Sequence, residues 1–190
     1  MKQKLKVRIL KLEGCGGCIQ RLATTPSLLE IMKHFDIIDS NISNEKTDYL
    51  FVEGFAVNLD QQRILKEAIE NTKNTVLFGS CSIQPNVMIA LPDTNKASQI
   101  TKIKAKLVGC PPSYDEINEL ISHLLIGKTL RTTNTPVCDD CIKNEIKCLL
   151  LKGVNCLGPC TKGNCGILCM KIGKSCSSCR TKIEEENDPD

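Results

Sequence analysis

The sequence has few of the residues on which nucleic-acid-binding proteins depend. It contains no tryptophan, two tyrosines and four phenylalanines, and aromatic residues make up 3% of it. So few rings offer no platform on which single-stranded nucleic acid could stack. The formal net charge is only +3, which argues against a surface that binds the phosphate backbone. These absences exclude nucleic acid as the expected partner.

The sequence also lacks the features of a leader or a membrane segment. Its first residues, MKQKLKVRIL, are basic, but charges interrupt their apolar run and no cleavage site follows. No apolar run approaches the roughly 20 residues that cross a bilayer as a helix. We therefore expect a cytoplasmic protein without a transmembrane segment.

Cysteine, by contrast, is abundant, with 13 residues in a chain of 190. Cytoplasmic thiols are kept reduced, so a dense set of them indicates metal ligands more than disulfides. The number is also odd, so disulfides could not use every thiol. Nine cysteines are packed between residues 138 and 179, and four are scattered upstream, at Cys15, Cys18, Cys81 and Cys110.

The scattered cysteines lie in a segment where predicted strands and helices alternate. Short runs of apolar or β-branched residues predict strands at 4–12, 35–39, 48–54, 74–80 and 105–110. Apolar residues at helical spacing predict helices at 19–33, 58–72 and 113–127. Such alternation implies a mainly parallel sheet covered on both faces. Five strands in this length predict an α/β, flavodoxin-like domain.

Two of the predicted helices carry clear signals at their ends. Pro26 should break or kink the first one. Ser113 and Glu116 form the capping box of the last one, and Gly127 is placed to end it.

Each scattered cysteine comes soon after a predicted strand. Open α/β sheets gather their ligands at the carboxyl ends of the strands, and four thiolates are the ligand number of one 4Fe–4S cluster. The glycines beside these cysteines would let the backbone approach a cluster closely. Two other interpretations stay open. Two of the cysteines could be buried core thiols beside a CxxC motif without function, or Cys15 and Cys18 could serve a thioredoxin-like redox role.

The nine downstream cysteines follow a polar stretch, TLRTTNTPV, that resembles a domain linker. Large apolar residues are scarce in 153–179, so the order of this segment must come from metal. Its CxxC pairs also fit two four-cysteine zinc sites. We expect a flavodoxin-like domain over 1–128, a small iron–sulfur domain with little regular structure over 129–182, and a disordered acidic tail over 183–190.

A family resemblance appears when the motifs are taken in order. The chain contains EGCGGC, FVEG, FGSC, VGCPP, PVCDDC, CLLLKGVNCLGPCTKGNCG and a final CSSC. This order resembles the small, electron-transferring subunit of nickel–iron hydrogenases over residues 5 to 180. It is most similar to the archaeal type that reduces a deazaflavin coenzyme or supplies a heterodisulfide reductase.

The resemblance implies three 4Fe–4S clusters in the chain and a nickel–iron site in a separate large subunit. The implied ligands are Cys15, Cys18, Cys81 and Cys110 for the proximal cluster, Cys165, Cys169, Cys176 and Cys179 for the middle cluster, and Cys138, Cys141, Cys148 and Cys156 for the outermost cluster. Cys160 is left over, where the family tends to have a small residue. Relatives often have a Gly-Gly pair after the third proximal ligand, whereas this chain has GSCSIQPN.

The implied partners are a hydrogenase or hydrogenase-like large subunit and a further flavin or iron–sulfur subunit. The large subunit should cover the proximal cluster through an extensive apolar interface that includes Ile19 and Ile83. Two alternatives stay open: an electron-transfer module of a non-hydrogenase redox complex, and a zinc-stabilised scaffold without a redox role.

A few other residues carry smaller expectations. Glu13 and Glu53 are each either an acid near the proximal cluster, with Glu13 a candidate proton relay, or an ordinary surface charge or cap. His34 and His123 lie outside the ligand motifs and are expected to be structural or surface groups.

Overall fold

The computed structural model of the protein describes residues 4–38, 45–83, 102–130 and 133–184. The chain divides into two compact units, Met1–Arg131 and Thr132–Asp190. The boundary predicted after residue 128 lies close to this division. Most of the segment between Cys81 and Cys110, part of which departs from the family, and most of the predicted acidic tail lie outside the described residues.

The described part of the first unit contains one five-stranded sheet. Its strands are β1 (Leu5–Lys11), β2 (Phe35–Ile38), β3 (Thr47–Glu53), β4 (Thr72–Phe78) and β5 (Ile103–Leu107). Every neighbouring pair is parallel, and the strand order is β2-β1-β3-β4-β5. This is the order of flavodoxin-like folds. The predicted fold class is confirmed.

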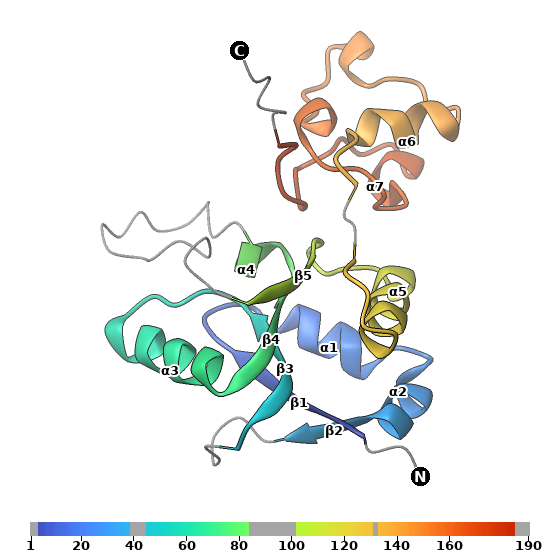
Figure 1. The fold of residues 1–190 in the computed structure, drawn as a ribbon. Coiled ribbons are helices and arrows are strands. Elements are labelled where there is room, and N and C mark those ends of the chain that lie inside the picture. Colours follow the sequence, from blue (N-terminus) through green and yellow to red (C-terminus); the bar gives the residue numbers. More distant parts are fainter. Residues whose placement is uncertain (1–3, 39–44, 84–101, 131–132, 185–190) are drawn as a thin grey trace, which may run out of the picture. The chain divides into compact units, whose positions relative to one another are not determined.

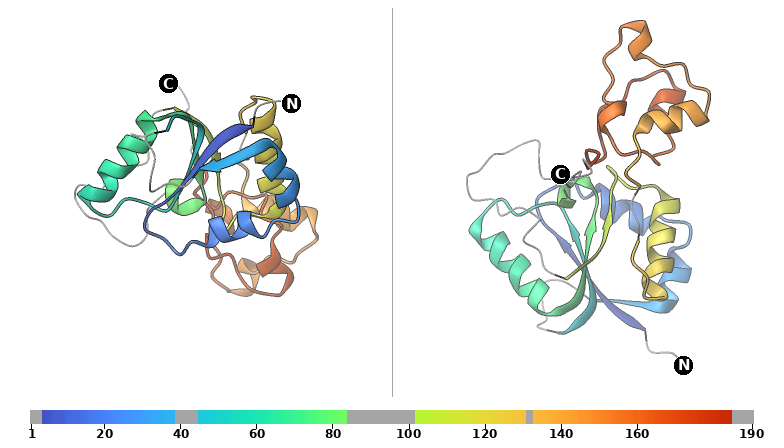
Figure 2. Two further views of the ribbon diagram at one scale, coloured as in Figure 1. Left: turned by 90° about the horizontal axis from the view of Figure 1, so that it is seen from below. Right: turned by 45° about the horizontal axis from the view of Figure 1, so that its top comes forward.

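Helices cover both faces of this sheet (Figures 1 and 2). They are α1 (Gly17–Ala23), α2 (Leu28–His34), α3 (Leu59–Glu70), α4 (Ser80–Ile83) and α5 (Tyr114–Leu125). Helices α1, α2 and α5 contribute Leu22, Ile31 and Ile117 to the larger apolar core, together with Phe51 and Phe78 of the sheet. Helix α3 covers the opposite face, where a smaller core forms around Leu50 and Leu77.

The predicted helix signals are confirmed. The predicted helix 19–33 is divided into α1 and α2, and Pro26 lies in the turn between them. The Ser113 side chain accepts a hydrogen bond from the Glu116 backbone N–H, and the Glu116 carboxylate accepts one from the Ser113 N–H. Gly127 follows α5 with a φ of 72°, which suits glycine at this position.

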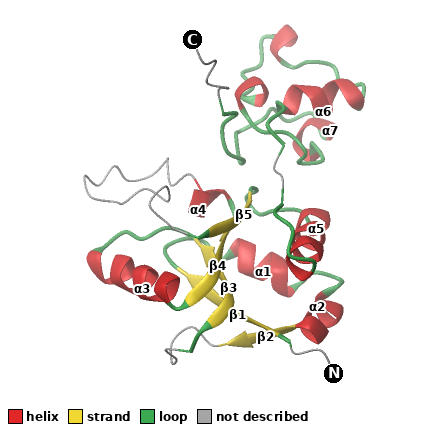
Figure 3. Ribbon diagram, viewed as in Figure 1, coloured by secondary structure: helices red, strands yellow, loops and turns green. Residues whose placement is uncertain are grey.

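The second unit has little regular structure, as predicted (Figure 3). Its described residues form α6 (Val137–Lys143), α7 (Leu168–Lys171) and two 3₁₀ turns at Leu150–Lys152 and Gly158–Cys160. Its apolar core is small and consists of Val137, Ile167, Met170 and Cys176, with four more cysteines packed around it. A core of this size contributes little stability, so the unit depends on whatever its thiols bind.

Candidate metal centres

The four upstream cysteines all lie at the carboxyl edge of the sheet. Cys15 follows β1 and Cys18 is in α1, Cys81 is in α4 directly after β4, and Cys110 follows β5. Because the strands are parallel, these segments meet at one edge. Cys18 is buried and Cys81 half-buried, whereas Cys15 and Cys110 are exposed. The site is therefore open to the surface on one side.

The two less exposed thiols of this group, Cys18 and Cys81, have raised pKa values. Burial is the main reason that the pKa of Cys18 rises to about 12, and Glu53, Cys110, Cys81 and Cys15 add to the rise. Burial likewise raises the pKa of Cys81, with further contributions from Cys110 and Cys15. The thiols of Cys18 and Cys81 are therefore neutral at pH 7, and binding a metal must displace their protons.

Two glycines shape the wall of this site. A Cβ atom added to Gly79 would lie 2.3 Å from the Cys18 Sγ, and one added to Gly109 would lie 2.5 Å from the Pro112 Cα. The φ angles are 93° at Gly79 and 143° at Gly109, which side chains of L-residues rarely adopt. The thiols thus surround a space that the backbone approaches closely, and a four-thiolate cluster fits such a site.

Glu53 fixes the start of α1, which carries Cys18. Its side chain is 3% exposed, and its two oxygens accept hydrogen bonds from the N–H groups of Cys18 (3.0 Å) and Ile19 (3.1 Å). Gly16, the residue at the N-cap of α1, offers no side chain for this purpose. Glu53 therefore caps α1 from the neighbouring strand and is not a surface charge. Its further role as an acid near the proximal cluster stays a prediction.

The other residues predicted near this site have simpler surroundings. Glu13 is exposed and exchanges two backbone hydrogen bonds with Phe55, each of 3.1 Å. Ile19 is half-buried, and Ile83 packs against the smaller core. The roles of Glu13 in proton relay and of both isoleucines in an interface stay predictions.

In the second unit, α6 positions one group of cysteines. Burial raises the pKa values of both Cys138 and Cys141, and the thiols of Cys148 and Cys156 contribute to both shifts. A Cβ atom added to Gly158 would lie 3.5 Å from the Cys156 Sγ and 3.6 Å from the Cys138 Sγ. The four cysteines predicted for the outermost cluster therefore lie near one another, beside a glycine.

The cysteines predicted for the middle cluster are connected less completely. Burial raises the pKa of Cys165, and Cys169 adds to this shift. The Cys176 N–H donates to the Cys156 Sγ over 3.4 Å, so Cys176 also lies against the other group. Cys179 and the leftover Cys160 are exposed, and the Cys160 thiol donates to the Leu157 carbonyl over 3.3 Å. How eight of these thiols divide into two sites stays a prediction.

Comparison with protein families identifies the first unit. Residues 15–124 match the family described as the 20 kDa subunit of NADH:ubiquinone oxidoreductase. The chain belongs to this family. The matched segment begins at Cys15 and contains Cys18, Cys81 and Cys110, so all four clustered thiols lie within it.

Similar curated proteins include archaeal hydrogenase subunits. The chain is 24% identical to the sulfhydrogenase 2 subunit delta of Pyrococcus furiosus, over 97% of this chain and 90% of the relative. It is 23% identical to a subunit of the F420-non-reducing hydrogenase of Methanothermobacter marburgensis, over 94% of this chain and 79% of the relative. The predicted resemblance to archaeal hydrogenase small subunits, and the prediction of an oxidoreductase subunit, are confirmed.

A solved structure with the same fold covers both units. A chain of the [NiFeSe] hydrogenase of Desulfovibrio vulgaris Hildenborough aligns with a TM-score of 0.70 at 17% identity, over 98% of this chain and 95% of that chain. At this identity the similarity is one of fold. Within the part of the present chain that the structure describes, no helix is long and apolar enough to cross a membrane.

The donor sets suit clusters of several metal ions. Among the described residues, no three histidine, cysteine, aspartate or glutamate side chains converge closely enough to hold one metal ion. A 4Fe–4S cluster does not need such convergence, because each of its four thiolates binds a different iron. An all-thiol donor set beside close backbone is chemically appropriate for such a cluster.

Proposed function

We propose that the chain is the electron-transfer subunit of a nickel–iron hydrogenase. It would relay electrons through three 4Fe–4S clusters between a large-subunit nickel–iron site and a flavin, deazaflavin or heterodisulfide-reductase partner in the cytoplasm. The observation that carries the proposal is the group of four thiols at the carboxyl edge of the sheet. The hydrogenase subunits among its relatives support the same function.

The chain's own residues would prepare the sites for electron transfer. A bound 4Fe–4S cluster takes up and releases single electrons. Cys15, Cys18, Cys81 and Cys110 would hold the first cluster, while Gly79 allows the backbone to approach it and Glu53 fixes the start of α1. Cys15 and Cys110 are exposed, so a cluster there needs a covering partner. We propose that the large subunit covers it, with Ile19 in the contact.

A second candidate keeps the clusters but has no nickel. The matching family is named for NADH:ubiquinone oxidoreductase, which is a redox complex of another kind. The large subunit would then resemble that of a hydrogenase without its nickel–iron site. Nickel analysis of the purified complex separates the two candidates.

The proposal is tested first by metal analysis of protein purified without oxygen. Three sites of the 4Fe–4S type predict roughly twelve iron and twelve acid-labile sulfide per chain. Colorimetric iron and sulfide determination, with zinc measured by mass spectrometry, provides the check. Stoichiometric zinc with little sulfide would support the zinc-stabilised scaffold and refute the proposal.

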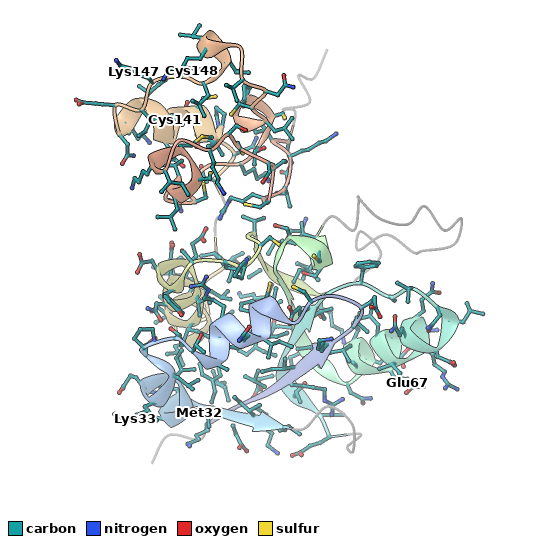
Figure 4. The ribbon with its side chains drawn as sticks, turned by 180° about the vertical axis from the view of Figure 1, so that it is seen from behind. Met32, Lys33, Glu67, Cys141, Lys147 and Cys148 are labelled. Carbon is teal, nitrogen blue, oxygen red and sulfur yellow. The ribbon has the colours of Figure 1, made fainter. Side chains whose placement is uncertain are left out.

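The outermost cluster would lie beside a surface suited to a redox partner. Cys148 is exposed, and Leu150, Leu151 and Val154 on the loop after it are exposed as well. Figure 4 shows Lys147 and Cys148 next to each other on the loop that follows α6. Lys143, Lys147 and Lys152 are also exposed and add positive charge to the same stretch of chain. We call the exposed residues between Lys143 and Val154 the exit surface, because electrons would leave the protein there. We propose that the exit surface binds an acidic, partly apolar electron-transfer partner.

Reversing charge on the exit surface should slow electron transfer to an acidic acceptor. In the variant K147E/K152E, the second-order rate constant for an acidic ferredoxin should fall about tenfold at low salt. Stopped-flow absorbance measures the rate, and high salt should reduce the difference. The cationic acceptor methyl viologen should show no such loss. The matched control K66E, which changes an exposed lysine on α3, should behave as the wild type, and equal slowing in both variants would contradict the proposed surface.

A further inference from the structure

Arg180 is a buried cation on a segment that pairs antiparallel with the residues preceding Cys165. The Lys162 N–H donates to the Thr181 carbonyl over 3.0 Å, and Thr161 forms an antiparallel bridge with Lys182. In this register the Arg180 backbone lies opposite the residues that precede Cys165. Arg180 is only 6% exposed, so its charge is held inside the unit and away from solvent.

Asp140 approaches the same segment from α6. It lies between Cys138 and Cys141 in the sequence, and its Oδ2 accepts a hydrogen bond from the Asn164 N–H over 2.5 Å. A Cβ atom added to Gly163 would lie 3.1 Å from this oxygen. The carboxylate therefore lies against the loop that ends at Cys165, and on the helix that carries two ligands of the other predicted cluster.

The two groups carry opposite charges, and each lies on a segment in contact with the residues that precede Cys165. Burial raises the pKa of Cys165, Arg180 counteracts this rise, and Asp140 adds to it. Asp140 also helps to raise the pKa of Cys141, after burial and the neighbouring thiols. The Asp140 carboxylate thus lies beside residues assigned to two different clusters, Cys141 on α6 and Cys165 after Asn164.

We propose that Arg180 and Asp140 are an opposed pair of charges that set the reduction potential of the cluster held by Cys165. Arg180 would raise this potential and Asp140 would lower it. The inference rests on the proposed function, because it requires a cluster at Cys165.

The direction of each effect follows from the charge of the electron. Reduction makes the cluster one unit more negative, so a nearby cation stabilises the reduced form and a nearby anion destabilises it. Solvent screens a buried charge far less than an exposed one. Charges and hydrogen bonds around the thiolates are known determinants of cluster potentials. A purely structural role of Arg180 in packing the C-terminal segment would not predict opposite shifts from two oppositely charged residues.

The test is a redox titration of the complete iron-loaded protein, followed by electron paramagnetic resonance. The signal lost or altered in Cys165→Ala identifies the cluster concerned. Arg180→Gln should decrease its reduced-to-oxidised ratio at fixed potential by about tenfold, which corresponds to a shift of about −59 mV for a one-electron couple. Asp140→Asn, which keeps an acceptor for the Asn164 N–H, should shift the potential upwards and should also raise that of the cluster held by Cys141.

Two further variants control for structure and for general charge. Arg180→Lys keeps the charge and should leave the potential near that of the wild type. Lys182→Gln removes an exposed cation from the same segment and should also have little effect. Unchanged potentials in both Arg180→Gln and Asp140→Asn, or shifts in the same direction, would overturn the inference. If Arg180→Gln does not assemble, the reduction potentials of Asp140→Asn and Arg180→Lys test the inference. Absence of iron from the wild type would instead refute the proposed function.

Discussion

Replacing Cys165 with alanine should remove or convert one cluster, with a loss of about one to four iron atoms per chain. Replacing Cys160 should leave the iron content unchanged. The reason is that Cys165 is half-buried beside Cys169 within the small core of the second unit, whereas Cys160 is exposed and its thiol bonds to a backbone carbonyl. Iron and sulfide analysis of the two variants, purified in parallel without oxygen, measures the difference.

The Cys160 variant is the matched control for this experiment, since both changes remove a thiol from the same unit. Equal iron loss in the two variants would show that Cys160 is a ligand and that the assignment of the middle cluster is wrong. Normal iron content in both variants would show that Cys165 is not a ligand. The appearance of a 3Fe–4S signal only in Cys165→Ala would identify the position of the lost ligand directly.

Replacing Gly79 with alanine should abolish cluster binding at the first site. The new methyl group would lie 2.3 Å from the Cys18 Sγ, so either the thiol or the turn that leads into α4 must move. Cys18 and Cys81 would then no longer present their sulfurs to the same cluster. We expect a loss of about four of twelve iron atoms per chain, together with weaker binding of the large subunit. Iron analysis and co-purification measure the two effects.

Gly127→Ala provides the control for backbone strain. Gly127 also has a positive φ, of 72°, but a Cβ atom there meets nothing within 4 Å. The substitution should cost about 1–2 kcal/mol of stability and leave the iron content intact. If Gly79→Ala lowers the melting temperature as Gly127→Ala does and retains all its iron, the close approach of the backbone to Cys18 has no role in the site.

The sequence predicts the first unit well because its signals are local. Pro26 interrupts a helical pattern, and Ser113 with Glu116 marks the start of α5, so each can be recognised without knowledge of the fold. The five strands follow from apolar runs that end near glycine, aspartate or serine. Parallel pairing then places the ends of β1, β4 and β5 at one edge, which is why Cys15, Cys81 and Cys110 could be grouped in advance.

The role of Glu53 could not be predicted in the same way. It ends β3, and its partners are the N–H groups of Cys18 and Ile19 in a helix that follows β1. Only the strand order, with β1 beside β3, brings these segments together. The missing side-chain cap at Gly16 is the one signal that could have suggested a capping residue from elsewhere.

The second unit is harder to predict because almost all of its order depends on its cysteines. Spacing gives no information on which thiols share a metal site, and Cys176 illustrates the difficulty. The family resemblance groups it with Cys165 and Cys169, yet its N–H contacts the Cys156 sulfur. A backbone donor can bond to a sulfur of one cluster while its own thiolate binds another, so this contact is compatible with either assignment.

The positions of the ligands along the chain have a consequence for how the protein matures. The thiols at the edge of the sheet are contributed by segments near residues 15, 81 and 110, which meet only after β1, β4 and β5 have paired. Contacts between such distant segments form slowly, so under the proposed function the sheet would be assembled before the first site accepts iron. The downstream cysteines all lie within 138–179, where the apolar core is small. Under the proposed function, iron delivery and folding are coupled in this unit. A cell short of iron would then accumulate chains with a finished sheet and an unstructured C-terminal unit.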